Sequence, residues 1–576
     1  MSKHHISRLA AIMVAKGIEQ VVVSPGSRNA PVIILFAANP QLHLLSVADE
    51  RSAAFFALGL AIQSGKPVAL LCTSGSAVLN YAPAIAEAYY QKVPMLVITA
   101  DRPVELIDQG DSQTIRQQNI YANYIRKSFN LPVEVKSAND EWYFDRIINE
   151  AIDRTLYPTP GPVQLNLPLD EPLYDIDTNV TGIQPRIIDY IAGKVNLDPM
   201  HLDLLVKKWN SASSKLIIAG QMSPLDGSTG KLLTALADDP TVVVLTECTS
   251  NLPYPGFINC IDRTLAQIPV DKNDEFKPQI LLTLGGAIVS KKVKAMLRNM
   301  HPEQHWHINP DTDDFHFDTY KSLTITLSLK PEDFLQQLLE SLNHSKPVKK
   351  DQSEMMSYSA RWKEADRIST ERHDKFLANL PFSDMKAYEH IFASLPEGTG
   401  LHLGNSTPVR YGQLFTHKQG IAFYGNRGTS GIDGCASTAA GFALKHKGLT
   451  LVITGDIGFF YDSNALWNNN IKETFRVIVI NNGGGNIFRI IDGPTGYDEL
   501  EPFIETRHHL ETSGIAANFN FEYYRADNEE SLKEKLPLFL AAQPSGRPAL
   551  LEVATDNIIS SNTLKEYFRY LKKNDD

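Results

Sequence analysis

Cysteine is scarce in this sequence of 576 residues, and the few that occur are far apart: Cys72, Cys248, Cys260 and Cys435. Because no two of them are spaced as CxxC, the sequence excludes a zinc knuckle and a CxxC redox motif. Their neighbours are apolar or small, which predicts four buried free thiols in a reducing compartment.

An excess of basic charge is also lacking. Lys and Arg number 55 against 66 Asp and Glu, the formal net charge is −11, and no long run is basic. This balance argues against a nucleic-acid partner and against binding to a membrane surface. It says nothing about a local cationic pocket.

Long apolar runs are missing as well. No stretch approaches the roughly 18 apolar residues that a membrane span requires. Residues 1–20 have apolar side chains at helical spacing but not the continuous apolar core of a signal peptide. We therefore expect a cytoplasmic protein with no membrane span.

What is present is a repeated pattern of apolar strands followed by helices. At roughly 150 residues per domain, the length predicts three or four domains. Continuous apolar runs that end in Gly, Ser or Asp indicate parallel sheets covered on both faces. We expect such strands at 21–26, 67–75, 94–103, 215–221, 241–247, 279–286, 305–311, 400–405, 449–456, 475–482 and 549–556.

The pattern predicts an α/β protein of three consecutive doubly wound parallel-sheet domains, the middle one Rossmann-like. The expected domains are residues 1–185, 190–348 and 380–576, and a charged helix over about 349–378 leads into the third. No GxGxxG motif occurs, and residues 227–231 (GSTGK) lack the Walker spacing, so two common phosphate-binding motifs are excluded.

The most informative spacing lies between Asp456 and Asn482. Each follows an apolar strand, a helix is expected over 462–473, and Gly483–Gly485 come next. In a right-handed βαβ unit the carboxyl ends of the two strands lie side by side, where such folds bind ligands. A carboxylate, an amide oxygen and a backbone carbonyl suit Mg²⁺, and the glycines let the backbone approach a diphosphate. A helix cap followed by a plain turn would produce the same pattern.

Residues 455–457 (GDI), followed by Asn481-Asn482, resemble the metal- and diphosphate-binding motif of thiamin-diphosphate enzymes. Ile457 departs from the usual GDG at a place where a backbone contact is needed. Further motifs resemble the menaquinone-pathway family that makes 2-succinyl-5-enolpyruvyl-6-hydroxy-3-cyclohexene-1-carboxylate, in order from about residue 20 to 490: 24–32, 49–61, 73–88, 99–106, 404–410, 426–434 and 481–488.

The resemblance implies a carboligase, a transferase with thiamin diphosphate and Mg²⁺ (or Mn²⁺) as cofactors. Its reaction would be decarboxylation of 2-oxoglutarate, then conjugate (Stetter-like) addition of the resulting carbanion to isochorismate. The pyrimidine half of the cofactor would bind the first domain and its diphosphate the third domain of a partner subunit. A homodimer is then the minimum active unit, and a homotetramer is the expected assembly.

Glu50 is the implied catalytic residue, because its carboxyl would hydrogen-bond the pyrimidine ring of the cofactor and favour loss of the reactive proton. Without the resemblance, a charge at a helix N-terminus would be the simpler interpretation. Ile432 would support the bent cofactor, and Asp456, Asn482 and the Gly484 carbonyl would hold the metal. The implied cofactor-binding set is Glu50, Asn405, Ser406, Ile432, Gly455, Asp456, Ile457, Asn482, Gly484, Asn486 and Ile487.

Substrates with several carboxylates call for guanidinium and ammonium groups. The implied substrate-binding set is Ser27, Arg28, Arg102, Gln113, Lys291, Lys292, Ser406, Arg410, Arg427, Ile487 and Phe488. Two positions depart from the family pattern. Ser112 stands where an Asn is expected, and Lys292 stands where an Arg often sits, which would replace a bidentate grip by a point charge.

Three alternatives remain. One is another thiamin-diphosphate enzyme, such as an acetolactate synthase or a 2-oxoacid decarboxylase, which would not need the basic set. A non-catalytic binding protein is disfavoured by the joint presence of Glu50, Asp456 and Asn482. A nicotinamide or flavin oxidoreductase is disfavoured because the middle block lacks a dinucleotide motif.

Overall fold

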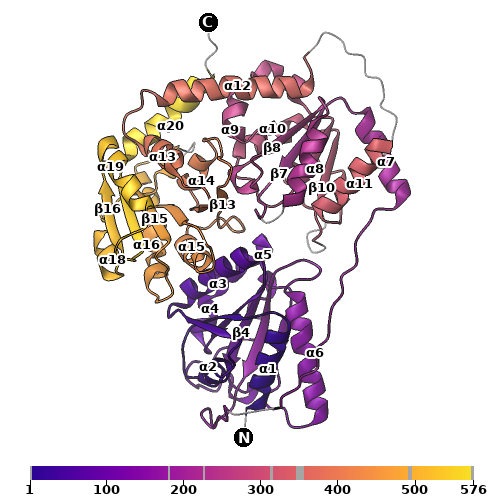
Figure 1. The fold of residues 1–576 in the computed structure, drawn as a ribbon, viewed down its shortest axis with the longest axis vertical. Helices are drawn as coiled ribbons and strands as arrows, with labels where there is room; N and C mark the ends of the chain where they lie inside the picture. The colour runs from indigo at the N-terminus through magenta and orange to yellow at the C-terminus, as the bar shows by residue number, and fades with distance from the viewer. Residues whose placement is uncertain are drawn as a thin grey trace.

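The computed structural model describes residues 3–178, 182–224, 227–311, 316–344, 356–490 and 496–572. The chain forms three parallel sheets in series, each covered by helices (Figure 1). This confirms the predicted doubly wound α/β architecture. The predicted limits at residues 1, 348 and 576, and the start of the charged helix at 349, lie outside the described residues.

The first sheet has six strands in the order β2-β1-β3-β4-β6-β5. Its central strands are buried along their whole length, because helices lie on both faces and every position therefore needs an apolar or paired side chain. The strands are β1 (Gln20–Val23), β2 (His43–Ser46), β3 (Val68–Cys72), β4 (Met95–Asp101), β5 (Ser128–Asn130) and β6 (Pro162–Pro168), and the helices are α1 (His4–Ala15), α2 (Ala30–Ala37), α3 (Glu50–Ser64), α4 (Ser76–Asn80), α5 (Ala82–Gln91) and α6 (Ala138–Arg154).

The middle sheet has five strands in the order β11-β10-β9-β7-β8. All of its pairings are parallel. Its strands are β7 (Lys215–Ala219), β8 (Val242–Thr246), β9 (Ile280–Leu284), β10 (Gln304–Ile308) and β11 (Ile325–Leu327), and its helices are α7 (Pro199–Ser211), α8 (Gly227–Ala237), α9 (Ile261–Thr264), α10 (Lys291–Met300) and α11 (Pro331–His344).

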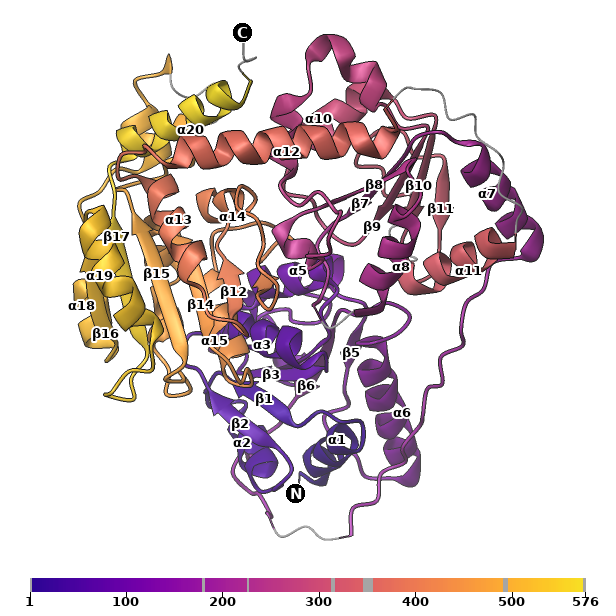
Figure 2. The ribbon, with the colours of Figure 1, turned by 45° about the horizontal axis from the view of Figure 1, so that its top comes forward.

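The third sheet has six strands in the order β13-β12-β14-β15-β17-β16. The long helix α12 (Tyr358–Leu377) crosses from the middle sheet to this one and packs along α20 (Asn557–Lys572) (Figure 2). The strands are β12 (Gly400–Leu403), β13 (Ala422–Tyr424), β14 (Thr450–Gly455), β15 (Phe475–Asn481), β16 (Glu522–Ala526) and β17 (Ala549–Ala554), and the other helices are α13 (Asp384–Ser394), α14 (Thr407–Gly412), α15 (Cys435–Ala443), α16 (Asp456–Tyr461), α17 (Ile487–Ile490), α18 (Ser513–Asn518) and α19 (Glu529–Leu540).

Helices α3 and α15 join the first sheet to the third, and they lie against each other in Figure 1. Each helix has a glycine at the crossing. A Cβ added to Gly59 would lie 1.8 Å from the Thr438 carbonyl oxygen, and one added to Gly441 would lie 1.9 Å from the Phe56 carbonyl oxygen. The two backbones therefore touch, and only glycine permits this approach.

One predicted element is wrong. The helix expected over 462–473 is instead α16, which begins at Asp456, followed by a short 3₁₀ turn over Ser463–Leu466. Asparagine side chains replace helical backbone bonds beyond that turn: Asn468 Nδ2 donates to the Ala465 carbonyl, and the Asn470 N–H donates to Asn468 Oδ1. Asparagine competes for backbone groups in this way and so disfavours helix interiors.

Two other expectations, on the cysteines and on the N-terminal helix, are confirmed. All four cysteines are free and buried, and residues 4–15 are helical as α1. Among the described residues, no helix combines the length and the apolar character that crossing a membrane requires.

Candidate active site

Asp456 lies at the carboxyl end of β14 and is 2% exposed. Its Oδ1 accepts the N–H of Ile457 at 2.7 Å, and its Oδ2 accepts the N–H groups of Gly483 and Gly484 at 2.8 and 2.9 Å. The strand pair β14–β15 thus brings the two predicted motifs together. The contact to Ile457 uses only its backbone, so the departure from GDG leaves it intact.

Asn482 follows β15, and its side chain is oriented by Asp384, a buried residue at the start of α13. Asn482 Nδ2 donates to Asp384 Oδ2 at 3.1 Å, which fixes the amide orientation because a carboxylate only accepts. Thr555 and Ser560 donate to the other carboxylate oxygen. Asn482 Oδ1 is left buried with no partner. A cation would satisfy this oxygen, because buried polar atoms are rarely left unpaired.

The glycines after Asn482 form a loop that is packed closely against the segment around Glu505. Gly483 has φ +76° and Gly484 has φ +154°, and a Cβ on Gly484 would lie 3.0 Å from the Glu505 carbonyl oxygen. The N–H of Gly485 donates to that carbonyl at 2.6 Å, and the Gly484 carbonyl accepts the N–H of Asn486 at 2.9 Å. Both side-chain polar atoms of Asn486 are buried without a partner.

A second group of polar atoms lies at the ends of β12 and β13. Asn405 Nδ2 donates to the carbonyls of Asn426 and Gly431, and Asn405 Oδ1 accepts from Arg427. The next residue, Ser406, has φ +75° at the start of α14. The geometry links a predicted cofactor-binding residue directly to a predicted substrate-binding one.

Arg410 and Arg427 each have a buried Nε with no hydrogen-bond partner. Burial lowers the pKa of Arg427, and repulsion from Arg410 acts in the same direction. Ile432 is 36% exposed, a large apolar side chain that this chain leaves partly uncovered. Ile487 and Phe488 begin α17 and are half-buried.

Glu50 begins α3 at the junction with the preceding strand, as predicted. Asp49 caps the helix by accepting the Ser52 N–H at 3.0 Å, which leaves the Glu50 carboxylate available. Asn80 donates to Glu50 Oε2 at 3.2 Å, and the contact is exposed.

The predicted basic residues of the first sheet are both engaged. Arg28 is 4% exposed, donates to the Leu169 carbonyl and pairs with Glu171 at 3.3 Å. Arg102, directly after β4, donates twice to the Ser112 carbonyl. Ser112 therefore acts through its backbone, and its departure from Asn leaves this bond in place. Gln113 has φ +54° and is exposed, as is Ser27.

Lys291 is exposed at the start of α10, whereas the ammonium group of Lys292 is buried against another helix. The Lys292 ammonium lies 3.0 Å from the centroid of the Phe568 ring on α20, buried and without a hydrogen-bond partner. Burial lowers the pKa of Lys292 to about 8. Lys292 thus faces the C-terminal helix, and its predicted contact with substrate stays a prediction.

Most of the predicted residues form two groups, one beyond the carboxyl ends of the strands of the first sheet and one beyond those of the third sheet. Within the described part of the chain, no hydrogen bond or ion pair joins Glu50, Arg28 or Arg102 to the residues around Asp456. Sequence reasoning missed Asp384 and also His508, whose Nε2 lies 3.3 Å from Asp456 Oδ2. No motif marks either residue, since each acts through a contact distant in the sequence.

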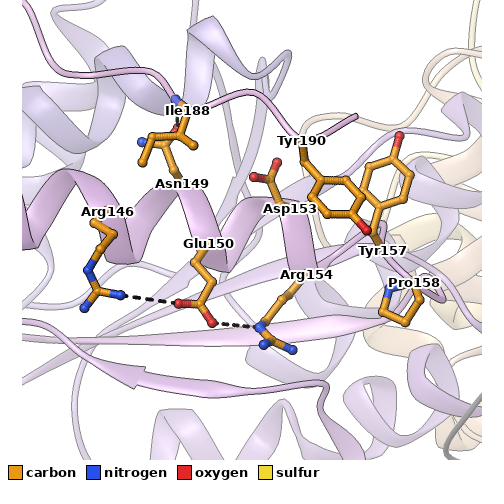
Figure 3. A pocket seen from close by; sticks show the side chains of 9 residues that line it. All are labelled: Arg146, Asn149, Glu150, Asp153, Arg154, Tyr157, Pro158, Ile188 and Tyr190. Carbon is orange, nitrogen blue, oxygen red and sulfur yellow. Dashed lines mark hydrogen bonds and ion pairs between the residues drawn. The ribbon is translucent and has the colours of Figure 1, made fainter. Parts of the chain in front are cut away.

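Two cavities lie in the described part of the chain, and one of them reaches a predicted site residue. One of about 370 Å³ lies between α6 and the segment that carries Ile188 and Tyr190, and no predicted site residue lines it (Figure 3). The other, of about 560 Å³, is lined by residues of all three sheet units, including Arg427.

Known proteins are similar in sequence to this chain over almost its whole length. Residues 6–120 match the family described as thiamine pyrophosphate enzyme, N-terminal TPP binding domain, and residues 200–394 match the one described as middle domain of thiamine pyrophosphate. A 2-succinyl-5-enolpyruvyl-6-hydroxy-3-cyclohexene-1-carboxylate synthase of Flavobacterium psychrophilum is 43% identical over 558 residues, 96% of each chain. The chain belongs to this synthase family.

Other members of the synthase family are similar over comparable lengths. The protein of Christiangramia forsetii is 41% identical over 590 residues, 99% of each chain, and that of Porphyromonas gingivalis is 39% identical over 99% of this chain and 97% of its own. Membership in the synthase family confirms the predicted resemblance and makes the chain a thiamin-diphosphate enzyme. The roles of individual residues stay predictions.

Proposed function

We propose that this protein decarboxylates 2-oxoglutarate and adds the remaining four-carbon unit to isochorismate in menaquinone biosynthesis, giving 2-succinyl-5-enolpyruvyl-6-hydroxy-3-cyclohexene-1-carboxylate and CO₂. The observation that carries the proposal is similarity over nearly the whole chain to synthases of that name. The domains would be residues 1–185, 190–348 and 380–576, and the four buried free cysteines support a cytoplasmic location.

The residues around Asp456 fit a divalent cation and a diphosphate. Asp456 Oδ1 has spare acceptor capacity beyond one N–H, and Asn482 Oδ1 has no partner. Hard oxygen donors of this kind suit Mg²⁺ or Mn²⁺, with the Gly484 carbonyl as a third protein ligand. Asn405, Ser406 and Asn486 would contact the diphosphate. Among the described residues, no three His, Cys, Asp or Glu side chains cluster as metal ligands, and the set proposed here differs in kind because it combines one carboxylate with an amide and a backbone carbonyl.

When bound, thiamin diphosphate supplies a nucleophilic carbon that attacks the keto group and accepts the electrons released with CO₂. Glu50 would hold a proton at its carboxyl against the pyrimidine ring. Asp49 caps α3 in its place and Asn80 contacts only Oε2, so Oε1 of Glu50 remains for that contact. Ile432 would pack beneath the bent cofactor, which explains an isoleucine left 36% exposed.

The arginines would bind the substrate carboxylates. Arg410 and Arg427 each keep a buried N–H without a partner, which a carboxylate oxygen would satisfy. Arg28 and Arg102 lie close enough for their charges to interact at the first sheet. Their bonds to backbone carbonyls hold each guanidinium in place while part of its fork remains for substrate.

We also propose that the active site forms between two subunits of a homodimer, within a homotetramer. Exposed apolar side chains near both groups support this assembly: Leu79 (51%), Tyr461 (54%) and Trp467 (53%). Mixed subunits test it. Glu50→Gln and Asp456→Asn, each inactive alone, should regain about a quarter of the wild-type activity after co-expression and random pairing. A site within one chain would regain none.

The reaction itself is tested by incubating the protein with 2-oxoglutarate, isochorismate, thiamin diphosphate and Mg²⁺. We expect CO₂ release and the conjugate adduct by mass spectrometry. Pyruvate without isochorismate is the control. Release of CO₂ from pyruvate, with no adduct from the first mixture, would instead indicate an acetolactate-type enzyme.

A further inference from the structure

Arg427 is a half-buried cation with an unusual balance of charge. Among the described residues, no carboxylate lies within ion-pair distance of it, and its one hydrogen-bonded side chain is the neutral Asn405. Two carboxylates nevertheless act on its pKa, since Glu247 and Glu87 both oppose the lowering caused by burial. They come from different units, Glu247 from the middle sheet and Glu87 from the first.

Glu87 holds the loop that follows Arg427. It lies on α5, is 1% exposed, and accepts the N–H of Gly428 on Oε1 and that of Thr429 on Oε2, both at 2.7 Å. The Thr429 hydroxyl donates to Oε2 at 2.6 Å. A Cβ at Gly428 would lie 2.7 Å from the Glu87 carbonyl oxygen, so this loop is pressed against α5.

Glu247 holds the start of α10 in the same manner. It follows β8, is 1% exposed, and accepts the N–H of Val289 on Oε2 and that of Ser290 on Oε1, both at 2.7 Å. Ser290 in turn caps α10 by accepting the Val293 N–H at 3.1 Å. The first residue of that helix is Lys291.

The two glutamates therefore share one arrangement. Each accepts hydrogen bonds on both carboxylate oxygens from two adjacent backbone N–H groups, and these groups lie next to a basic residue in the sequence. Neither glutamate contacts the side chain of that basic residue. A direct ion pair would occupy the guanidinium that substrate needs. A half-buried cation with no nearby negative charge would be costly. Carboxylates held by backbone N–H groups reduce this cost and leave the Arg427 Nε unpaired. Burial raises the pKa of Glu247 to about 7, so its share of the negative charge falls as the pH drops below neutrality.

We propose that Glu87 and Glu247 are positioning residues that hold Arg427 and the N-terminus of α10 in place for the carboxylates of the substrate. The proposal rests on the substrate-binding role of Arg427 given above. It also predicts that the first and middle units affect substrate affinity through residues that never touch the substrate.

The test uses Glu87→Gln and Glu247→Gln in the full-length holoenzyme. Glutamine keeps the shape but places an NH₂ against one of the two backbone donors, so one bond is lost and the segment shifts. We expect the KM for at least one carboxylate substrate to rise about tenfold or more, with kcat and thiamin-diphosphate affinity within about twofold of wild type. Thr429→Val, which removes only the hydroxyl donor, gives a smaller shift and serves if Glu87→Gln does not fold.

Asp145→Asn is the matched control. Asp145 is 2% exposed and accepts a backbone N–H from Arg186 at 2.7 Å, but it lies on α6 against Arg8. This variant should lose thermal stability with an unchanged KM. A KM rise in the control as large as in the glutamate variants would overturn the proposal, because general loosening would then explain both.

A double-mutant cycle with Arg427→Lys separates the substrate-binding role of Arg427 from the positioning role of the two glutamates. If Glu87 acts through Arg427, its effect on KM should largely disappear in that background, whereas the effect of Glu247→Gln, which acts through the start of α10, should persist. Arg427→Lys with a normal KM would refute the role proposed for Arg427. A raised KM in Arg427→Lys, with unchanged KM in both glutamate variants, would refute only the positioning role.

Discussion

The first and third sheets of this chain have the same strand order, and each places one long buried helix, α3 or α15, after its second strand. The two helices cross at reciprocal glycines, Gly59 and Gly441. The chain therefore carries two copies of one scaffold face to face, and the chemistry of the two can be compared position by position.

The difference lies in the residues directly after matching strands. β4 and β15 both have seven residues, so Arg102 and Asn482 follow them at the same place. In the neighbouring strands, Val68 of β3 pairs with the first residue of β4, and Thr450 of β14 pairs with the first residue of β15. Counted from Val68 and Thr450, Ser74 and Asp456 occupy the same position. The first scaffold thus presents a hydroxyl and a guanidinium, and the third a carboxylate and an amide. Parallel sheets bind ligands beyond the carboxyl ends of their strands, so the residue after each strand would set the charge of a ligand bound there.

Replacing either acidic side chain, Glu50 in the first scaffold or Asp456 in the third, should produce the largest effects. The two variants should also separate the roles of the two scaffolds. Glu50→Gln is expected to lower kcat by about 10²–10⁴-fold while thiamin diphosphate still binds. Asp456→Asn is expected to lose cofactor binding that depends on Mg²⁺. Calorimetric titration of each variant with and without Mg²⁺ checks this. Equal cofactor affinity in both variants would contradict the division of labour.

The reciprocal glycines give the next largest effect. Gly59→Ala and Gly441→Ala should each destabilise the protein by at least about 1–3 kcal/mol, because the added methyl meets a carbonyl oxygen below 2 Å and the helices must separate. Thermal midpoints measure the loss. Gly514→Ala in α18, where nothing lies within 4 Å, is the control and should be neutral or slightly stabilising. A large effect at only one crossing glycine would break the two-fold comparison.

Ile432 belongs to the third scaffold alone and should have a moderate effect. Ile432→Ala is expected to weaken thiamin-diphosphate binding by about 1–2 kcal/mol, roughly tenfold, because the contact beneath the cofactor is lost. Ile34 on α2, with a similar exposure of 39%, is the matched control and should show no change when replaced by Ala. Cofactor fluorescence titration distinguishes them.

Buried histidines give the smallest effect near neutral pH. Burial lowers the pKa of His402, in the third unit, to about 3 and that of His373, on α12, to about 3. As the pH falls below about 6.5, the unfolded chain binds protons that the native chain does not, so the free energy of unfolding falls. His402→Phe keeps the ring contacts with Tyr424 and Phe442. It should reduce the loss between pH 7 and pH 6 by less than about 1 kcal/mol.

Urea titrations at the two pH values measure this difference, with exposed His43→Gln as the control. Equal pH dependence in wild type and His402→Phe would mean that His402 already titrates normally in the native protein.

Most of the fold could be predicted because its central strands are continuous apolar runs that end in polar residues. The edge strands β5, β11, β13 and β16 were not predicted, since they are short or only partly buried and their patterns resemble loops. The central strand β6 was also missed, because it begins and ends with proline. Asparagines at 468–470 interrupted a helix that the apolar spacing favoured.

The site shows the same division. The pairing of Asp456 with Gly483 and Gly484 followed from two adjacent strands, so sequence spacing could predict it. Asp384 orients Asn482 across 98 residues, and Glu87 holds Gly428 across 341. Such contacts depend on how three units pack. Local sequence carries no trace of them, because a buried carboxylate and a surface one look alike in a helix.

The last strand and the last helix of the chain have a consequence for biosynthesis. The first sheet is complete at residue 168, where β6 ends. The third sheet stays open until β17 enters between β15 and β16. In helix α20, the Leu571 carbonyl then accepts hydrogen bonds from the side chains of Gln267 and Arg372. Because domains fold in order during translation, the first unit folds while the third sheet is still incomplete, and α3 stays uncovered until β17 has been made.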